Sequence, residues 1–226
     1  MMLMMLGMGF AAEQMMVRLG PPEIVDWAPS AKKFPYRVPF SEHTTVKISK
    51  LKKSVNGTLM PTGLILFEPG NKGDTVFAMR RGSVIEVSTI KSPVNNFDKD
   101  GHVNNEGDKM ICEIRIKHSD ETVAGYVGIE VGKNFVQIGD AVDPSTPLGI
   151  VAETPSVVCA VTFVYVDVNK NNQPYIFSPH FALASGLTPV PDDKQEWTPY
   201  LDDAMMTADM SWAEKKKYDT MHNIKP

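Results

Sequence analysis

The sequence has few cysteines, no excess of basic residues and no long apolar run, and these absences exclude several common functional classes. It has only two cysteines in 226 residues, a net charge of −4, and no apolar run long enough to cross a bilayer. Nucleic-acid binding needs a basic surface, but here 23 basic residues are scattered among 27 acidic ones. We therefore predict neither a nucleic-acid partner nor a transmembrane span.

The two cysteines do not resemble a metal site. Cys112 and Cys159 each lie in an apolar run, and neither has a second cysteine or a histidine at metal-ligand spacing. They fit two small buried residues. If the protein is exported, a disulfide between neighbouring strands is the alternative, and the sequence cannot decide between the two.

The first residues form a short apolar run, MMLMMLGMGF. A run of this length suits the core of a signal peptide, and we predict one over residues 1–11, with cleavage before Ala12 and export to the periplasm or cell envelope. The basic residues that usually precede such a core are missing. Their absence either weakens this prediction or indicates a translation start upstream of Met1, and a Met-rich cytosolic beginning is the alternative to export.

The rest of the chain divides into three parts by composition. Residues 12–57 are rich in proline and charge and predict an irregular lead-in with one short strand over 44–48. Residues 58–178 alternate short apolar runs with Gly, Pro, Asn and Asp, which indicates a mainly β domain, a small antiparallel barrel or sandwich. The predicted strands are 63–67, 75–79, 83–89, 110–117, 122–130, 148–151, 157–168 and 175–177.

Two segments of the chain carry more specific local predictions. The run from Met110 to Lys117 alternates, so we expect Glu113, Arg115 and Lys117 to face solvent. Residues 91–109 are dense in Asn, Asp and Gly and predict a loop without the ligand spacing of a calcium-binding EF-hand.

Residues 179–226 predict an extension with one or two short helices. Thr198-Pro199 can start a helix, and Ser211 with Glu214 forms a capping box. We expect the apolar residues of this extension to pack on the β domain rather than on a partner.

The middle of the chain resembles the M23 zinc peptidases of the lysostaphin and LytM type. The most specific segment is Val136–Val151, whose Gly139-Asp140 and Pro147-Leu148-Gly149 are similar to the hairpin of this family, although lipoyl-type carriers and sugar-phosphotransferase proteins share this hairpin. Glycines at these places allow the tight turns of a small barrel. The resemblance implies the fold called the duplicated hybrid motif. It also includes residues 62–85, 116–129 and 161–174.

The residues that would bind zinc are not those of an active M23 peptidase. The family uses two histidines and an aspartate as ligands, with further histidines near the metal, and activates a water at the open position. When the motifs are anchored on Gly63, Tyr126 and Phe163, the corresponding positions are Pro61, Ile65, Gly128, Ala160 and Thr162. Four of these have no donor atom, and a threonine hydroxyl is a poor zinc ligand.

The remaining histidines do not restore the site. His43, His102 and His222 lie in the lead-in, the loop and the tail, and His118 matches a family position that is not a ligand. His180 has neither an aspartate nor a second histidine at the required spacing. We predict no metal and no cofactor.

The resemblance leads to one main functional hypothesis and two alternatives. The main one is a catalytically inactive M23-like domain of the cell envelope that binds peptidoglycan-like material or regulates a partner protein, with Tyr126 and Tyr165 as candidate groove residues. Phe163 and Thr162 are further candidates, although Phe163 fits a buried core position better than a binding role. The alternatives are an active zinc peptidase with displaced ligands and a structural component of an envelope assembly.

Overall fold

A computed structural model of the chain describes residues 23–25, 36–55, 58–70, 73–91, 110–119, 121–152, 159–167 and 173–224. Within these ranges, side chains are described except at 23–25, 52–55, 58–62, 91, 159–161 and 165–167. The predicted signal peptide and residues 92–109 of the predicted loop lie outside the described residues. No helix in the described part of the chain is long and apolar enough to cross a membrane.

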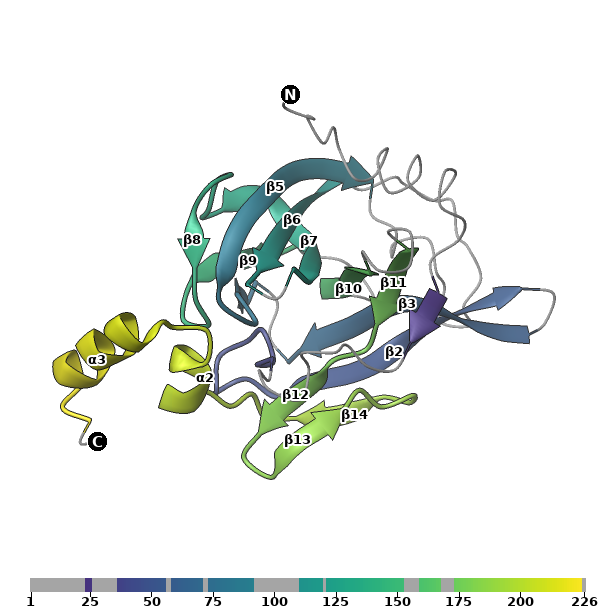
Figure 1. Cartoon of the computed structure of the whole chain (residues 1–226). Coiled ribbons are helices and arrows are strands. Elements are labelled where there is room, and N and C mark those ends of the chain that lie inside the picture. The colour runs from purple at the N-terminus through teal and green to yellow at the C-terminus, as the bar shows by residue number, and fades with distance from the viewer. Residues whose placement is uncertain are drawn as a thin grey trace.

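Twelve of the described strands form one curved sheet (Figure 1). All of its pairs are antiparallel except the pair of β1 with β11. Its main path runs β14 (Gln195–Trp197), β2 (Val46–Val55), β3 (Thr58–Pro69), β10 (Cys159–Asp167), β7 (Val123–Asn134), β6 (Met110–His118), β5 (Gly82–Lys91) and β8 (Ala141–Val142).

Shorter strands attach to this path on both sides. β1 (Glu23–Val25) pairs with β11 (Gln173–Phe177), which pairs with β10, while β4 (Thr75–Phe77) pairs with β9 (Pro147–Val151), which pairs with β7. β12 (His180–Leu183) and β13 (Gly186–Pro189) form a separate hairpin, and α2 (Asp203–Thr207) and α3 (Trp212–Met221) follow.

The predicted mainly β fold with short C-terminal helices is confirmed. Among the described residues, the end strands β14 and β8 do not pair with each other, so the sheet is not closed into a barrel. The sheet also extends beyond the predicted 58–178 domain, because β2 precedes that range and β14 follows it.

The predicted lead-in contributes directly to the core. Tyr36, Val38 and Phe40 are fully buried, and the buried Arg37 donates to the carbonyls of Val38, Phe40 and Pro144. Burial lowers the pKa of Arg37 to about 10. The proline-rich composition of this stretch indicated irregular backbone, but its alternate apolar side chains still pack into the domain.

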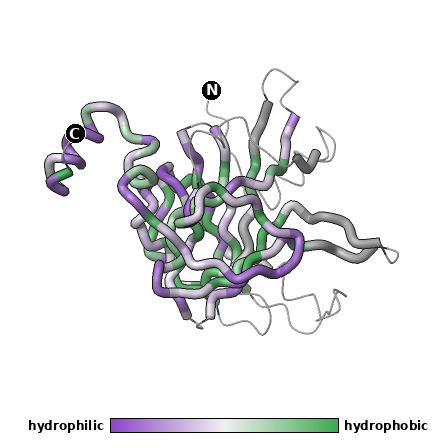
Figure 2. The backbone as a smooth tube through the Cα atoms, turned by 90° about the horizontal axis from the view of Figure 1, so that it is seen from below, coloured by the Kyte–Doolittle hydropathy of each residue, from purple (hydrophilic) through white to green (hydrophobic). Residues whose placement is uncertain are grey.

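The strands bury side chains on both faces. We call one face the main core, which includes Ile65, Phe67, Tyr126 and Phe163. The other is the second core, a smaller cluster of Leu66, Ile111, Val127 and Ala152. Figure 2 shows the hydrophobic chain segments gathered inside the sheet and the C-terminal helix outside it.

The prediction that Glu113 and Arg115 face solvent is wrong. Their exposed fractions are 6% and 8%, because the second core occupies this face of the sheet. Arg115 donates to Glu113 at 2.7 Å and to Glu86 at 3.2 Å. Burial raises the pKa of Glu113, while Arg115 opposes that rise. Charged residues can alternate on a covered face when they neutralise one another.

Gly149, in the hairpin segment that resembles the M23 family, is expected to tolerate no side chain. A Cβ at this position would lie 2.6 Å from Ile129 Cγ2 and 2.7 Å from the Lys133 carbonyl oxygen. We predict that Gly149→Ala lowers the free energy of unfolding by about 1–3 kcal/mol, measured by denaturant titration. Gly132→Ala is a poor control because of its positive φ, whereas Ala141→Gly, at an exposed residue, should change stability by less than about 1 kcal/mol. Unchanged stability of Gly149→Ala would contradict the close approach.

The C-terminal helices begin later than the first sequence signal indicated. α2 starts at Asp203, not at Thr198-Pro199, because the Asp202 carboxylate accepts the Met205 N–H and caps the helix. The predicted capping box of Ser211 and Glu214 is confirmed at the start of α3.

Candidate functional site

The five positions that correspond to the family's zinc-site residues lie on three neighbouring strands, β3, β10 and β7. Ile65 on β3 pairs with Val161 on β10, and Thr162 pairs with both Leu64 and Gly125. Ala160 pairs with Leu66 on one side and with Val127 on the other. The topology therefore brings β3, β10 and β7 together, as the resemblance implies.

The same positions do not converge on one face of these strands. Ile65 is 2% exposed and belongs to the main core. Ala160 and Thr162 pair with residues of the opposite face, where Leu66 and Val127 form the second core. Because side chains alternate along a strand, a shift of one residue moves a position to the other face. The five positions, as anchored in the sequence, therefore do not form a single site.

Gly128 has a structural role. Its φ is 104°, a conformation that side chains rarely adopt, and it lies opposite a register shift between Cys112 and Glu113. Tyr126 and Ile129, on either side of this point, both belong to the main core. Gly128 therefore forms a β-bulge, and a histidine here would be strained.

These residues do not fit a zinc ion. Ile65 offers hydrocarbon in a packed core, Gly128 offers no side chain, and Thr162 offers a hydroxyl group. Pro61 pairs with Lys52 through its backbone, and its side chain and that of Ala160 are outside the description. Within the described residues, no three His, Cys, Asp or Glu side chains are placed to hold a metal.

Tyr126 packs inside the domain instead of lining a groove. It is fully buried, and its hydroxyl oxygen accepts the Met79 N–H at 2.7 Å. The interpretation of Tyr126 as a binding residue is therefore wrong, because its hydroxyl holds a backbone turn. Tyr165 pairs with Tyr175 through its backbone, and its side chain lies outside the described residues.

The sheet order opposes a disulfide between Cys112 and Cys159. Cys112 on β6 has a free, buried thiol, whose pKa is raised by burial and by the neighbouring Glu113. β7 lies between β6 and β10, so the two backbones are two strand spacings, or about 9–10 Å, apart. A disulfide needs Cα atoms within about 7 Å.

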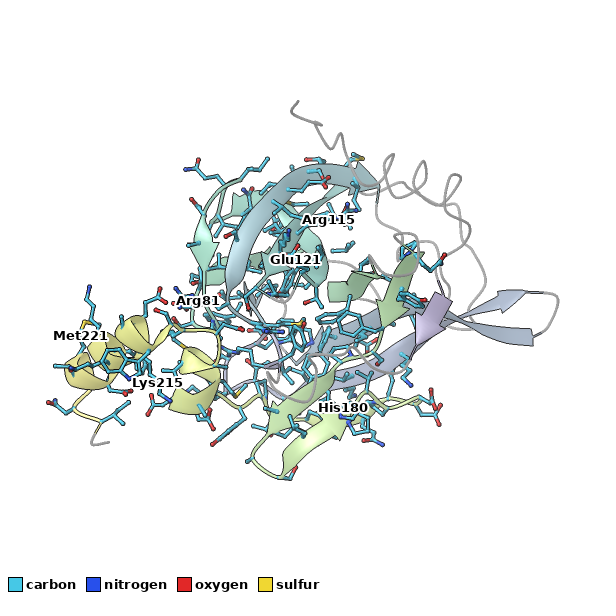
Figure 3. All side chains as sticks on the ribbon, viewed as in Figure 1. Arg81, Arg115, Glu121, His180, Lys215 and Met221 are labelled. Atoms are coloured by element: carbon cyan, nitrogen blue, oxygen red, sulfur yellow. The ribbon has the colours of Figure 1, made fainter. Side chains whose placement is uncertain are left out.

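His118 is a buried structural residue. Its exposed fraction is 2%, its Nδ1 lies 2.9 Å from the Arg81 carbonyl oxygen, and its ring meets Tyr36 edge-on at 5.5 Å. His180 is exposed at the start of β12, a strand outside the 12-stranded sheet that contains the predicted zinc positions (Figure 3).

A buried ion pair attaches the C-terminal helices to the domain. Arg80, before β5, donates through Nε and Nη2 to the two carboxylate oxygens of Asp209, both at 2.7 Å. Each side chain is only 2% exposed. Ser119 also donates to Asp209, and the Arg80 guanidinium lies over the Tyr36 ring. No local pattern indicates this pair, because its members are 129 residues apart.

A second, exposed ion pair lies beside the first. Arg81 pairs with Glu214 in the first turn of α3. Hydrogen bonds from Arg81 and Ser211 lower the pKa of Glu214 to about 2. The carboxylate also suits the positive end of the helix dipole. The adjacent residues Arg80 and Arg81 thus each bind one carboxylate of the C-terminal extension, Arg80 before α3 and Arg81 in its first turn.

A pocket of about 600 Å³ lies between α3 and the rim of the β domain. Figure 3 shows Arg81 on the domain side of α3 and Met221 at the far end of the helix. The lining contains three methionines and a leucine together with four charged residues. It comprises Arg81, Asp143, Ser145, Leu201, Met206, Met210, Glu214, Lys217, Tyr218, Met221 and His222.

No family model matches the sequence, and no curated protein matches it either. Among solved structures, the chain is similar to the M23 metalloprotease pseudoalterin from the deep sea, at 17% identity and a TM-score of 0.41, over 75% of this chain and 99% of that one.

Two further structures show the same kind of likeness. A zinc-containing peptidase from Vibrio cholerae matches at 17% identity and a TM-score of 0.38, over 64% of this chain and 38% of that one. The SpoIIQ–SpoIIIAH pore-forming complex matches at 15% identity and a TM-score of 0.40, over 64% of this chain and 89% of the matched one. The resemblance predicted from the sequence motifs is thus also found among solved structures.

Proposed function

We propose that this chain is a catalytically inactive, M23-like domain of the cell envelope that binds and regulates a partner protein. The observation that carries the proposal is the chemistry at the positions where M23 peptidases hold zinc. A shift of one residue in either motif brings no ligand to this place, because residues 60–66 of β3 and 159–163 of β10 contain no histidine, aspartate or glutamate, and Gly128 on β7 forms a bulge. Such a set cannot hold and activate a zinc-bound water.

Burial of the second core favours a protein partner over peptidoglycan. Four residues on this face of β3, β7 and β6, namely Leu66, Val127, Glu113 and Arg115, are each at most 8% exposed. A glycan strand or cross-bridge needs an open groove with accessible polar groups. The pocket beside α3 is instead lined by three methionines and a leucine among charged residues, which suits a protein side chain.

Metal analysis and a hydrolysis assay test the loss of catalysis. The full chain, purified with zinc in the growth medium, is expected to contain far less than stoichiometric zinc and to leave peptidoglycan and glycine-rich peptides intact. A zinc-loaded M23 peptidase, assayed in parallel, provides the positive control. Stoichiometric zinc with hydrolysis that a chelator abolishes would establish the alternative, an active peptidase with displaced ligands.

A sedimentation experiment tests the choice of partner class. Purified cell-wall sacculi are expected to leave the chain in the supernatant. Saturable co-sedimentation that soluble muropeptides compete away would assign peptidoglycan binding in place of a protein partner. Export is tested by fractionating cells that express the natural gene, where recovery in the cytosol alone would contradict an envelope role.

A further inference from the structure

The chain after β14 buries little apolar surface on the β domain. We call residues 198–224 the strap; it contains α2 and α3 and lies outside the sheet (Figure 1). Within the strap only Pro199, Met205 and Thr207 are buried, and none of the three is in α3. Because hydrophobic burial is the main force that holds elements together, polar contacts have an unusually large share in keeping the strap docked.

The most buried of these polar contacts is the pair of Arg80 with Asp209. The Arg80 guanidinium and the Ser119 hydroxyl donate three hydrogen bonds to the Asp209 carboxylate, at 2.7, 2.7 and 2.9 Å. A bidentate contact between charged groups is among the strongest hydrogen-bonded arrangements in proteins. The neighbouring pair of Arg81 with Glu214 is exposed and contributes much less.

The receiving side of this contact is built entirely within the β domain. Arg80 Nη1 donates to the Tyr36 hydroxyl at 3.4 Å, and the guanidinium lies over the Tyr36 ring at 5.5 Å. Tyr36 is fully buried, and its hydroxyl shares a hydrogen bond with Thr122. Ser119 directly follows β6. None of these contacts involves the strap, so they can hold the guanidinium in place without Asp209.

We propose that the strap is released and rebound as a unit, and that Asp209 is its latch, seated in a carboxylate-binding site that Arg80 and Ser119 form on the β domain. On release both charges regain their hydration, so opening the latch costs less than global unfolding. Release also uncovers Arg80, whose side chain is 2% exposed while the strap is docked. The strap thus controls access to a carboxylate-binding site, and this inference does not depend on the function proposed above.

Native-state hydrogen exchange of the full chain tests the release. α2 is only five residues long and cannot persist in water by itself. The Met205 and Met206 N–H groups, which bond to Asp202, are therefore protected only while the strap is docked. We expect them to exchange through an opening with a smaller denaturant dependence than amides of β6 and β7, because that opening exposes less surface. Equal denaturant dependence would mean that the strap opens only on global unfolding, which overturns the proposal.

The two adjacent arginines provide matched variants for the latch. Arg80→Met is expected to raise the exchange rates of the Met205 and Met206 amides about a hundredfold or more, while amides of β6 and β7 remain protected. Arg81→Met removes only the exposed pair with Glu214 and should change these rates less than about fivefold. Equal effects of the two variants would contradict the assignment of the latch.

A peptide added in trans tests the binding site. Asp209→Lys places a second cation beside Arg80, so we expect it to drive the strap off its own domain. A fluorescein-labelled peptide with the sequence of residues 198–212 should then bind this full-length variant at least about tenfold more tightly than the same peptide carrying Asp209→Asn. Adding Arg80→Met to the variant should abolish that difference, measured by fluorescence anisotropy.

Two peptide results would overturn the binding site. One is equal binding of the two peptides, and the other is a preference for the aspartate peptide that survives Arg80→Met. Failure of both peptides to bind at millimolar concentration, when the strap amides of the Asp209→Lys chain exchange freely, would do the same. The zinc, hydrolysis and sedimentation assays do not involve the strap, so failure of this proposal and failure of the inactive-domain proposal are distinguishable.

Discussion

Replacing Arg80 with methionine is expected to lower the free energy of unfolding by about 3–5 kcal/mol. The change removes both hydrogen bonds to Asp209 and leaves that carboxylate, 2% exposed, without its counter-charge. Methionine keeps much of the volume beside Tyr36, so the effect reports the ion pair rather than a cavity. Denaturant unfolding of the purified full chain measures it.

Arg81→Met is the matched control for Arg80→Met. The two arginines are adjacent, and each pairs with a carboxylate of the C-terminal extension. The Arg81 and Glu214 side chains are 32% and 48% exposed, so the control should lose less than about 1 kcal/mol. Equal losses in the two variants would contradict the view that burial of the Arg80–Asp209 pair determines its effect.

Arg115→Met is expected to lower the free energy of unfolding by about 3–5 kcal/mol at neutral pH. Arg115 lies between Glu113 and Glu86 and pairs with both. Without it, two poorly exposed carboxylates remain close together with no cation between them. Glu113→Gln removes one of these charges and keeps Arg115 paired with Glu86, so it should change stability by at most about 1 kcal/mol.

The pH dependence distinguishes this electrostatic effect from lost packing. Burial already raises the pKa of Glu113, and Arg115 counteracts that rise, so Arg115→Met raises the pKa further. A group whose folded-state pKa exceeds its unfolded value stabilises the fold as pH falls and protonates it. The deficit of Arg115→Met should therefore shrink between about pH 7 and pH 5. A constant deficit would show that packing causes the loss.

Much of the fold was predictable from local sequence pattern. The run from Met110 to Lys117 alternates in period two, and a strand formed there. Ser211 and Glu214 lie at the spacing of a capping box, and α3 begins there. These predictions succeeded because backbone geometry repeats over a few residues, so the periodicity of side chains reports it directly.

The candidate site depended on register, which the sequence could not supply. Motif anchors at Gly63 and Phe163 assigned plausible positions to the zinc site. The residues at these positions, however, lie on opposite faces of neighbouring strands. A shift of one residue inverts every side chain and leaves the local pattern nearly unchanged. Only the pairing between strands determines this register, and the bulge at Gly128 shifts the register again along β7.

The sequence by itself determined a mainly β chain with short C-terminal helices. Only the tertiary structure decided which charges are buried, since Glu113, Arg115 and Arg80 look like surface residues until the sheet and the extension cover them. It also decided where the extension lies, because Arg80 and Asp209 meet only after the chain has folded. Local sequence determines local backbone geometry, whereas burial and long-range pairing depend on which distant segments come together.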